Sequence, residues 1–296
     1  LDGAAARGWG DRPCFRAPGL TWSSADLLAR ANQIAHVLVD DLGLVPGNRV
    51  LLRGPNSPMM AALWFAVLKA GGVVVSTVPL SRARELVFIA DKARIALAIT
   101  DARLAADCAV AMAHHHDGRA REGGRVVEYN VASDVDATGS IEALMAGKPV
   151  TFTNVATAAD DVALIAFTSG TTGEGKGTMH FHRDVLAICD CFPRYVLKPE
   201  MDDVFIGSPP FAFTFGLGGL VLFPMRVGAS SVLLEQATPP FLIQAIQEYR
   251  ATTIFTAPTA YRAMLGMRQD YDLSSLKRCV SAGEALPLST LTAWRE

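Results

Sequence analysis

Apolar residues recur along the chain with helical and strand spacings in alternation. Between residues 25 and 39 they lie on one face of an amphipathic helix, and the run 49–52 after it is typical of a strand. Further pairs of a helix and a strand extend to about residue 129. After residue 168 the pattern predicts strands near 204–206, 231–234, 252–256 and 278–281, with helices near 240–249 and 258–267. Such alternation predicts an α/β fold with mostly parallel strands, helices on both faces, and ligands at the carboxyl ends of the strands.

A connector of small residues precedes the apolar run 162–167. It covers residues 154–161 and contains no helical or strand pattern. We therefore expect an N-terminal α/β subdomain over residues 1–160 and a second α/β subdomain over residues 161–296, joined without a flexible linker.

A loop rich in glycine and hydroxyl groups follows that apolar run. Residues 166–177 read Ala-Phe-Thr-Ser-Gly-Thr-Thr-Gly-Glu-Gly-Lys-Gly. Glycines let backbone amides approach an anion closely, the hydroxyls of Thr168, Ser169, Thr171 and Thr172 add donors, and Lys176 adds a positive charge. The stretch predicts a loop that holds the phosphates of a nucleoside triphosphate.

Two kinds of nucleotide-binding protein carry loops of this type. Residues 170–176 satisfy the start of the P-loop signature, G-x-x-x-x-G-K, but that signature requires Ser or Thr next, and the chain has Gly177. The order T-S-G-T-T-G followed by K-G instead resembles the phosphate loop of enzymes that form acyl- or aryl-adenylates. A P-loop ATPase remains the alternative.

The resemblance to adenylate-forming enzymes extends over nearly the whole chain. In the N-terminal half it rests on residues 45–50, 55–58 and 64–79, and in the C-terminal half on residues 211–219, 223–228, 257–262 and 281–287. The C-terminal segments are similar to those of benzoate-CoA and 2-aminobenzoate-CoA ligases. This resemblance implies two mostly parallel sheets flanked by helices, as in the N-terminal domain of these enzymes.

The resemblance also implies a reaction. A carboxylate attacks the α-phosphorus of ATP, pyrophosphate leaves, and coenzyme A then displaces AMP from the acyl-adenylate. ATP with Mg²⁺ and coenzyme A would be the co-substrates, and a small aromatic acid the partner. Lys176 and Thr171 are the expected catalytic residues. The expected nucleotide-binding residues are Thr168, Ser169, Gly170, Thr171, Thr172, Gly173 and Lys176 in the loop, with Gly283, Glu284, Ala285 and Leu286 around the adenine.

An acyl pocket is implied by the segment 211–219. Two aromatic rings beside glycines form a flat slot suited to a benzene ring, although core packing is the commoner role of phenylalanine. By resemblance the substrate-binding residues are Phe213, Thr214, Phe215, Gly216, Ala257 and Tyr261. Thr214 could face an ortho amino or hydroxyl group of the ring. A medium-chain fatty acid is the alternative substrate.

The chain departs from the family pattern in two places. Gly175 stands where the family normally has proline before the lysine, which predicts a looser loop and weaker ATP binding. The small C-terminal lid domain of the family does not follow residue 296, and residue 1 is not methionine, so we expect the chain to be part of a longer gene product. By itself it could be a fragment that binds nucleotide or acyl-adenylate without turnover.

Composition restricts the remaining possibilities. The formal charge of −2, from 27 basic and 29 acidic residues, provides no general attraction to nucleic acid or an anionic membrane. Five cysteines without a C-x-x-C pair suit a reduced, cytoplasmic protein. The three histidines at 114–116 point in different directions on a helix, so we expect no metal site in the protein itself.

Overall fold

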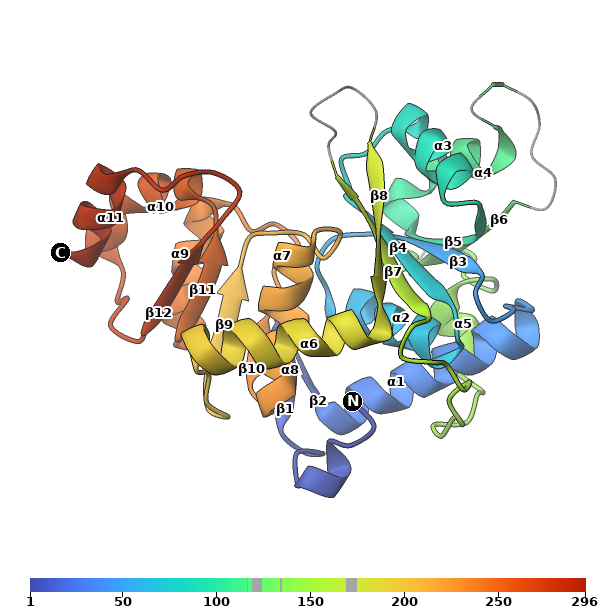
Figure 1. The fold of residues 1–296 in the computed structure, drawn as a ribbon, viewed down its shortest axis with the longest axis horizontal. Coiled ribbons are helices and arrows are strands. Elements are labelled where there is room, and N and C mark those ends of the chain that lie inside the picture. Colours follow the sequence, from blue (N-terminus) through green and yellow to red (C-terminus); the bar gives the residue numbers. More distant parts are fainter. Residues whose placement is uncertain (116, 119–123, 134, 169–174) are drawn as a thin grey trace. The chain divides into compact units, whose positions relative to one another are not determined.

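The computed structural model describes residues 1–115, 117–118, 124–133, 135–168 and 175–296. The chain divides into two compact units. Unit 1 comprises Leu1–Asp26, Asn56–Pro58 and Ala187–Glu296, and unit 2 comprises Leu27–Pro55 and Met59–Leu186. Each unit is built around a mixed sheet of six described strands, so the predicted α/β class and the two mostly parallel sheets are confirmed (Figure 1).

The sheet of unit 1 has the order β12-β11-β9-β10-β1-β2. Only the β1–β2 pair is antiparallel among its described pairs. The strands are β1 (Pro13–Ala17), β2 (Leu20–Ser23), β9 (Val204–Gly207), β10 (Ser230–Val232), β11 (Thr253–Thr256) and β12 (Arg278–Ser281). The helices are α7 (Thr214–Leu217), α8 (Phe223–Val227), α9 (Pro239–Tyr249), α10 (Pro258–Leu265) and α11 (Leu288–Arg295). The strands and helices predicted between residues 204 and 281 are thus present, with ends that shift by one or two residues.

The sheet of unit 2 has the order β6-β5-β3-β4-β7-β8, and its described antiparallel pair is β7–β8. The strands are β3 (Arg49–Arg53), β4 (Val73–Thr77), β5 (Ile95–Asp101), β6 (Arg125–Tyr129), β7 (Val162–Thr168) and β8 (Lys176–Phe181). The helices are α2 (Pro58–Lys69), α3 (Ala83–Lys92), α4 (Ala105–Ala113) and α5 (Ile141–Met145). The helices α1 (Ser24–His36) and α6 (His182–Phe192) contribute residues to both units, and the first residue of α2, Pro58, belongs to unit 1.

The units do not follow the predicted boundary at residue 160. Residues 162–186, with β7 and β8, belong to unit 2, and residues 1–26, with β1 and β2, belong to unit 1. The cause is strand pairing between distant parts of the sequence, since β4 pairs with β7 and β1 pairs with β10. Composition along the chain carries no sign of pairing between strands that are distant in sequence, so it cannot predict this division.

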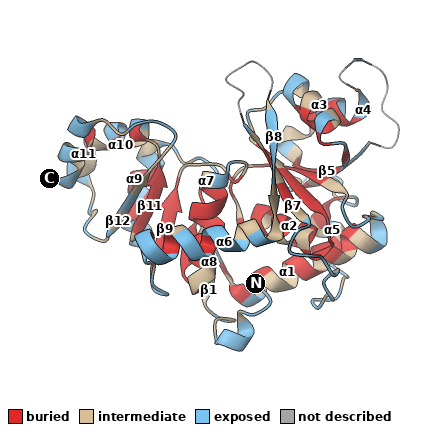
Figure 2. Cartoon of the chain, viewed as in Figure 1, coloured by how far each residue is buried: buried red, intermediate tan, exposed pale blue. Residues whose placement is uncertain are grey.

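Each unit has its own hydrophobic core, which its strands and the helices packed on them build together (red in Figure 2). In unit 1, Ile206 and Ile254 pack with Leu242 and Ile246 of α9. In unit 2, Leu51 and Val75 pack with residues of α3 and α4. Burial of such side chains contributes about 1.5–3 kcal/mol each. The parallel strands are held from both faces, which leaves their carboxyl ends as the place for a ligand.

A buried carboxylate joins the amino ends of the parallel strands in unit 1. Asp203, 1% exposed, accepts hydrogen bonds from Thr252 Oγ1 at 2.7 Å, Arg278 Nη1 at 2.8 Å and the Glu200 N–H at 2.7 Å. Burial alone would raise the pKa of Asp203, but these hydrogen bonds and the charge of Arg278 outweigh burial and hold the pKa below its ordinary value. The group is a structural anchor at the edge of the sheet opposite the predicted ligand edge.

Candidate functional site

The predicted phosphate loop connects two antiparallel strands of unit 2. Thr168 at the end of β7 is paired with Lys176 at the start of β8, and both side chains are exposed. Ser169, Gly170, Thr171, Thr172 and Gly173 lie outside the described residues. The segment after the loop has helical spacing from about residue 182 to residue 191, which is where α6 lies, and the structure places β8 between the loop and this helix. Lys176 is therefore the first residue of a hydrogen-bonded strand, and this pairing fixes the position of its backbone relative to Thr168.

Gly175, which replaces the family's proline, is not required by its surroundings. A Cβ there would meet Thr168 O at 3.3 Å and Phe88 Cε1 at 3.4 Å, and its φ is not left-handed. Contacts this short would require the neighbouring atoms to move by a few tenths of an ångström. The expectation that Gly175 loosens the loop stays a prediction.

In unit 1, three parallel strands end at the same edge of the sheet. Phe255 of β11 is in register with Gly207 of β9, and Thr256 is in register with Ser281 of β12. The segments that follow these strands are the ones singled out in the sequence as acid-binding and adenine-binding. All of these segments begin at the carboxyl edge of the sheet, where open α/β sheets bind ligands. The structure thus brings the predicted residues of unit 1 to one edge.

Hydroxyl groups mark this edge. Ser208 Oγ lies 2.6 Å from Thr256 Oγ1, which is a hydrogen bond across β9 and β11. Ser281 Oγ, on the next strand, is buried and has no hydrogen-bond partner among the described residues. A buried polar atom without a partner costs roughly 1–3 kcal/mol, and Ser281 Oγ is one of several such atoms among the described residues.

The predicted acyl segment forms a turn and the short helix α7. Phe213 is 46% exposed, and Thr214 beside it is exposed. Phe215 is half-buried, with its ring centroid 5.5 Å from that of Phe255. Phe213 and Thr214 are thus open to a ligand, whereas Phe215 has a packing role, in line with the commoner use of phenylalanine.

Gly216 is required by close packing of the backbone. A Cβ at this position would lie 2.2 Å from Pro210 O and 2.5 Å from Pro209 O. No side chain fits in such a space without moving backbone atoms. Gly216 therefore shapes the predicted acyl segment, and no larger side chain fits in its place.

Asn56 supports the turn before the predicted acyl segment and is not among the predicted site residues, although its segment contributes to the family resemblance. Its side chain is 7% exposed, donates from Nδ2 to Pro209 O at 2.9 Å, and accepts the N–H of Phe211 at Oδ1, also at 2.9 Å. Sequence spacing could not link residues more than 150 positions apart. The signal that could have found it is the Pro-Pro pair at 209–210, which lacks two backbone donors and needs support from elsewhere.

Ala257 and Tyr261 have different surroundings. Ala257 precedes α10 at its N-terminus and is partly exposed. Tyr261 is buried, donates its hydroxyl to Val280 O at 3.0 Å, and packs edge-on against Trp294 at 4.9 Å between ring centroids. Burial raises the pKa of Tyr261, so the phenol stays protonated as a donor. These contacts give Tyr261 the role of anchoring β12.

The predicted adenine segment leaves β12 through a left-handed glycine. Gly283 has φ +95°, and a Cβ there would meet no heavy atom within 4 Å. The backbone conformation, and not lack of space, favours glycine at this position. Glu284 and Ala285 are exposed, and Leu286 is partly exposed before α11 begins. The segment presents its backbone and the exposed side chains of Glu284 and Ala285.

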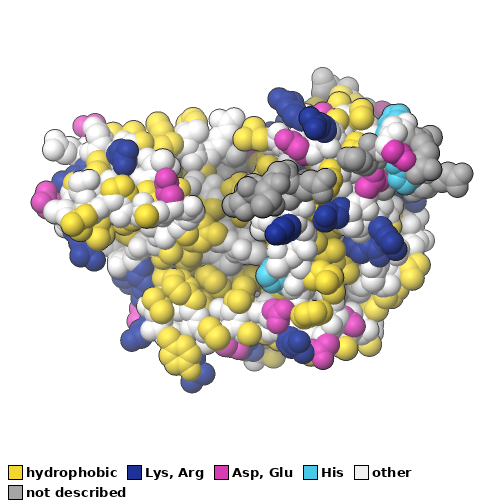
Figure 3. Space-filling view, turned by 45° about the horizontal axis from the view of Figure 1, so that its top comes forward, with side chains coloured by type: hydrophobic (Ala, Val, Ile, Leu, Met, Phe, Trp, Pro, Cys, Tyr) yellow, Lys and Arg dark blue, Asp and Glu magenta, His cyan; other side chains and the backbone are white. Residues whose placement is uncertain are grey.

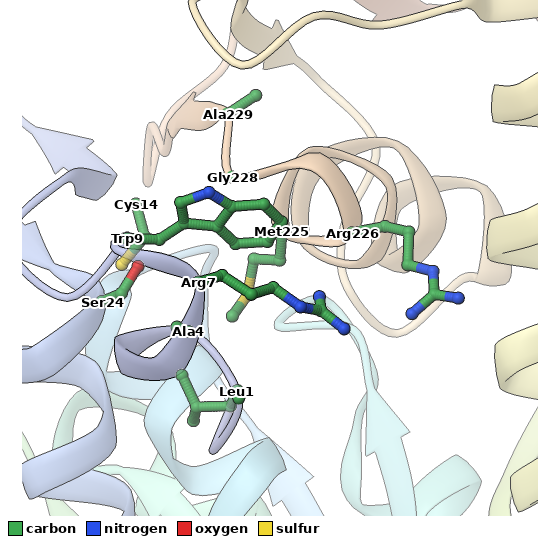
Figure 4. Close-up of a pocket in the computed structure, with 11 residues that line it drawn as sticks. Leu1, Ala4, Arg7, Trp9, Cys14, Ser24, Met225, Arg226, Gly228 and Ala229 are labelled. Atoms are coloured by element: carbon green, nitrogen blue, oxygen red, sulfur yellow. The ribbon is translucent and has the colours of Figure 1, made fainter.

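A cavity of about 130 Å³ lies elsewhere in unit 1, between the first residues of the chain and the turn after α8 (Figure 4). Trp9 lies against Gly228, whose φ is +75° and whose added Cβ would be 2.8 Å from the indole. Of the cavity's two cations, Arg226 is paired with Asp190 at 2.8 Å. The residues that line it include none of the predicted site residues.

Two absences hold for the part of the chain that the structure describes. No three His, Cys, Asp or Glu side chains there come together as a metal site. None of its helices combines the length and the apolar character needed to cross a bilayer. Basic and acidic side chains both occur on the face drawn in Figure 3.

Comparison with known families gives one match that covers almost the whole chain. The sequence profile described as AMP-binding enzyme matches residues 3–296.

Individual proteins share a moderate identity with the chain. Benzoate-CoA ligase of Thauera aromatica is 27% identical, over 91% of this chain and 50% of that protein. Long-chain-fatty-acid-CoA ligase of Bacillus subtilis (strain 168) is 29% identical, over 97% of this chain and 55% of that protein. The chain spans about half the length of these curated relatives.

Among solved structures, an anthranilate CoA ligase in complex with anthranoyl-AMP superposes with a TM-score of 0.89 and 25% sequence identity. The match covers 99% of this chain and 56% of that one. The arrangement of strands and helices described above is therefore that of the N-terminal part of this ligase.

Proposed function

Because this chain belongs to the AMP-binding enzyme family, we propose that it provides the ATP- and acid-binding part of an AMP-forming CoA ligase. The observation that carries the proposal is the common edge of β9, β11 and β12, where the segments 208–216 and 282–286 both begin. The exposed pair Thr168 and Lys176 on β7 and β8 supports a phosphate site at the hydroxyl-rich loop.

The proposed chemistry proceeds in two steps. A carboxylate oxygen attacks the α-phosphorus of ATP and the bond to pyrophosphate breaks, which forms the acyl-adenylate. The thiolate of coenzyme A then attacks the acyl carbon and AMP leaves. Phosphoryl chemistry of this kind depends on positioning and on donors around the departing charge, and not on a covalent nucleophile. Mg²⁺ enters as part of the ATP substrate.

The residues have distinct proposed roles. Lys176 and Thr171 stabilise the charge of the leaving pyrophosphate, together with Thr168, Ser169 and Thr172. Gly170 and Gly173 let backbone amides approach the phosphates. The adenine lies against Gly283, Glu284, Ala285 and Leu286, and the acid lies against Phe213, Thr214 and Ala257.

The proposed substrate is a small aromatic acid, with 2-aminobenzoate or benzoate as the leading candidates. The exposed Phe213 beside Thr214 supports a flat slot with one polar group. The names of two similar proteins, a benzoate-CoA ligase and an anthranilate CoA ligase, agree with this choice. A fatty acid is the second candidate, favoured by the similarity to a long-chain-fatty-acid-CoA ligase.

Five free cysteines support a reducing compartment, and we propose the cytoplasm. The test of the function is formation of CoA thioesters by the full-length protein, measured by mass spectrometry with benzoate, 2-aminobenzoate, hydroxybenzoates and hexanoate. We expect an aryl thioester with AMP and pyrophosphate in equal amounts. Release of orthophosphate without thioester would refute the proposal in favour of an ATPase.

A further inference from the structure

The turn that leads to the acyl segment depends on a side chain from a distant part of unit 1. Pro209 and Pro210 have no backbone N–H, so this stretch cannot complete a strand-like ladder by itself. Asn56 supplies what is missing: its Nδ2 donates to Pro209 O and its Oδ1 accepts the N–H of Phe211, each at 2.9 Å. The amide thus holds both sides of Pro210.

Asn56 is well placed to hold this turn firmly. It is 7% exposed, so water competes little for its two hydrogen bonds. It belongs to a three-residue segment, Asn56–Pro58, that is part of unit 1 although the chain on both sides of it belongs to unit 2. An asparagine amide is among the few neutral side chains that donate and accept at once in a plane, as a backbone segment does.

The turn held by Asn56 determines where the acyl segment lies. Pro210 O accepts the N–H of Phe213 at 3.1 Å, which places Phe213 at the start of α7. Gly216 packs directly against the carbonyls of Pro209 and Pro210. A shift of these two carbonyls would therefore move both ends of the segment that carries Phe213 and Thr214.

We propose that Asn56 is a positioning residue that sets the shape of the acid slot and so selects flat aryl acids over flexible alkyl acids. The inference rests on the proposed function of the slot. A rigid slot favours a rigid ring, because the ring loses no internal freedom on binding whereas an alkyl chain does. Loosening the turn should remove this advantage more than it impairs ATP binding.

The experiment compares Asn56→Ala with Asn32→Ala in the full-length protein. Asn32 is a matched control: it is 5% exposed, its Nδ2 donates to Val150 O at 2.7 Å, and it lies in unit 2. A third variant, Asn56→Asp, keeps the acceptor for the Phe211 N–H but loses the donor to Pro209 O. For each, kcat and KM are measured with benzoate, hexanoate and ATP, and amide hydrogen exchange is followed over residues 208–217.

For Asn56→Ala we expect kcat/KM for benzoate to fall about 10- to 100-fold, the scale on which small displacements act in positioned sites. The ratio of benzoate to hexanoate turnover should fall as well, while KM for ATP changes by less than about twofold. The Phe211 amide should lose its protection from exchange in Asn56→Ala and retain most of it in Asn56→Asp. Asn32→Ala should change none of these readouts.

An unchanged ratio of benzoate to hexanoate in Asn56→Ala, or an equal change in Asn32→Ala, would overturn the inference. A wild-type protein that makes no thioester from any acid would instead refute the proposed function. In that case hydrogen exchange still decides the positioning role: unchanged protection of residues 208–217 in Asn56→Ala would overturn it without any activity measurement.

Discussion

The substitution Gly216→Ala tests how tightly the backbone packs around the acyl segment. In Gly216→Ala the new methyl carbon would lie 2.2 Å from Pro210 O and 2.5 Å from Pro209 O. Non-bonded carbon and oxygen atoms approach to about 3.3 Å, so the carbonyls must move by roughly 1 Å. Overpacking of this kind costs about 1–3 kcal/mol. Because Asn56 holds the obstructing backbone, we expect a value near the upper end.

The same displacement should impair the proposed activity. A shift of about 1 Å in a positioned site can lower kcat/KM by on the order of 100-fold, and here it should act on the acid more than on ATP. Stability is measured by urea unfolding, and kinetics by thioester formation in the full-length protein. The matched control is Gly266→Ala at the end of α10, where φ is −69° and an added Cβ would meet only Ala263 O, at 3.8 Å.

The control should be neutral or more stable by about 0.4–1 kcal/mol, because alanine restricts the unfolded chain. Substitutions at neutral surface positions change the free energy of unfolding by at most about 0.5 kcal/mol. If the free energy of unfolding of Gly216→Ala lay within that range of the wild-type value and the variant bound the acid equally well, the described packing would be refuted.

Three other changes probe separate parts of the molecule. Tyr261→Phe leaves Val280 O without its donor and should lower the free energy of unfolding by about 1–3 kcal/mol, while KM for the acid stays unchanged. A large rise in this KM with unchanged urea unfolding would show that Tyr261 contacts the ligand instead. Lys176→Met should raise KM for ATP about tenfold or more, because it removes a charged contact to phosphate. The free energy of unfolding should not change, because the side chain is exposed. Equal ATP kinetics in wild type and variant would exclude the contact. The hydrogen bonds to Asp203 hold its pKa below the ordinary value, so its contribution to stability is complete above that value and is lost as the pH falls through the lower, folded-state pKa. Asp203→Asn should therefore flatten the acid side of a plot of stability against pH, and an identical acid limb in the variant would contradict the assignment.

Local pattern was sufficient for much of the fold. The strands β9, β11 and β12 and the helices α9 and α10 lie close to where apolar spacing put them. The strands β9 and β11 and the two helices bury apolar side chains in one core, whereas β12 is only partly buried. The carboxyl-edge rule likewise brought the acid and adenine segments of unit 1 together. Both rest on physics that acts over a few residues or on one general property of parallel sheets.

Features that depend on distant pairing were not accessible in this way. The strand β8 is mostly exposed and reads as polar, so its role as the partner of β7 follows from antiparallel pairing and not from hydrophobic spacing. Tyr261 is expected among the substrate-binding residues, and the motif gave no sign that its buried hydroxyl donates to Val280 O. Asn56 contacts residues more than 150 positions away. Motif position indicates which segment forms a site, but not which way each side chain points.

The proposed function requires that the full-length protein activates a carboxylic acid by transfer of AMP. The most direct measurement is isotope exchange between pyrophosphate and ATP, with benzoate, 2-aminobenzoate or hexanoate added and coenzyme A left out. We expect exchange that depends on the acid, is faster with an aryl acid, and is lost in Lys176→Met. No exchange with any acid, together with steady release of orthophosphate from ATP, would contradict it.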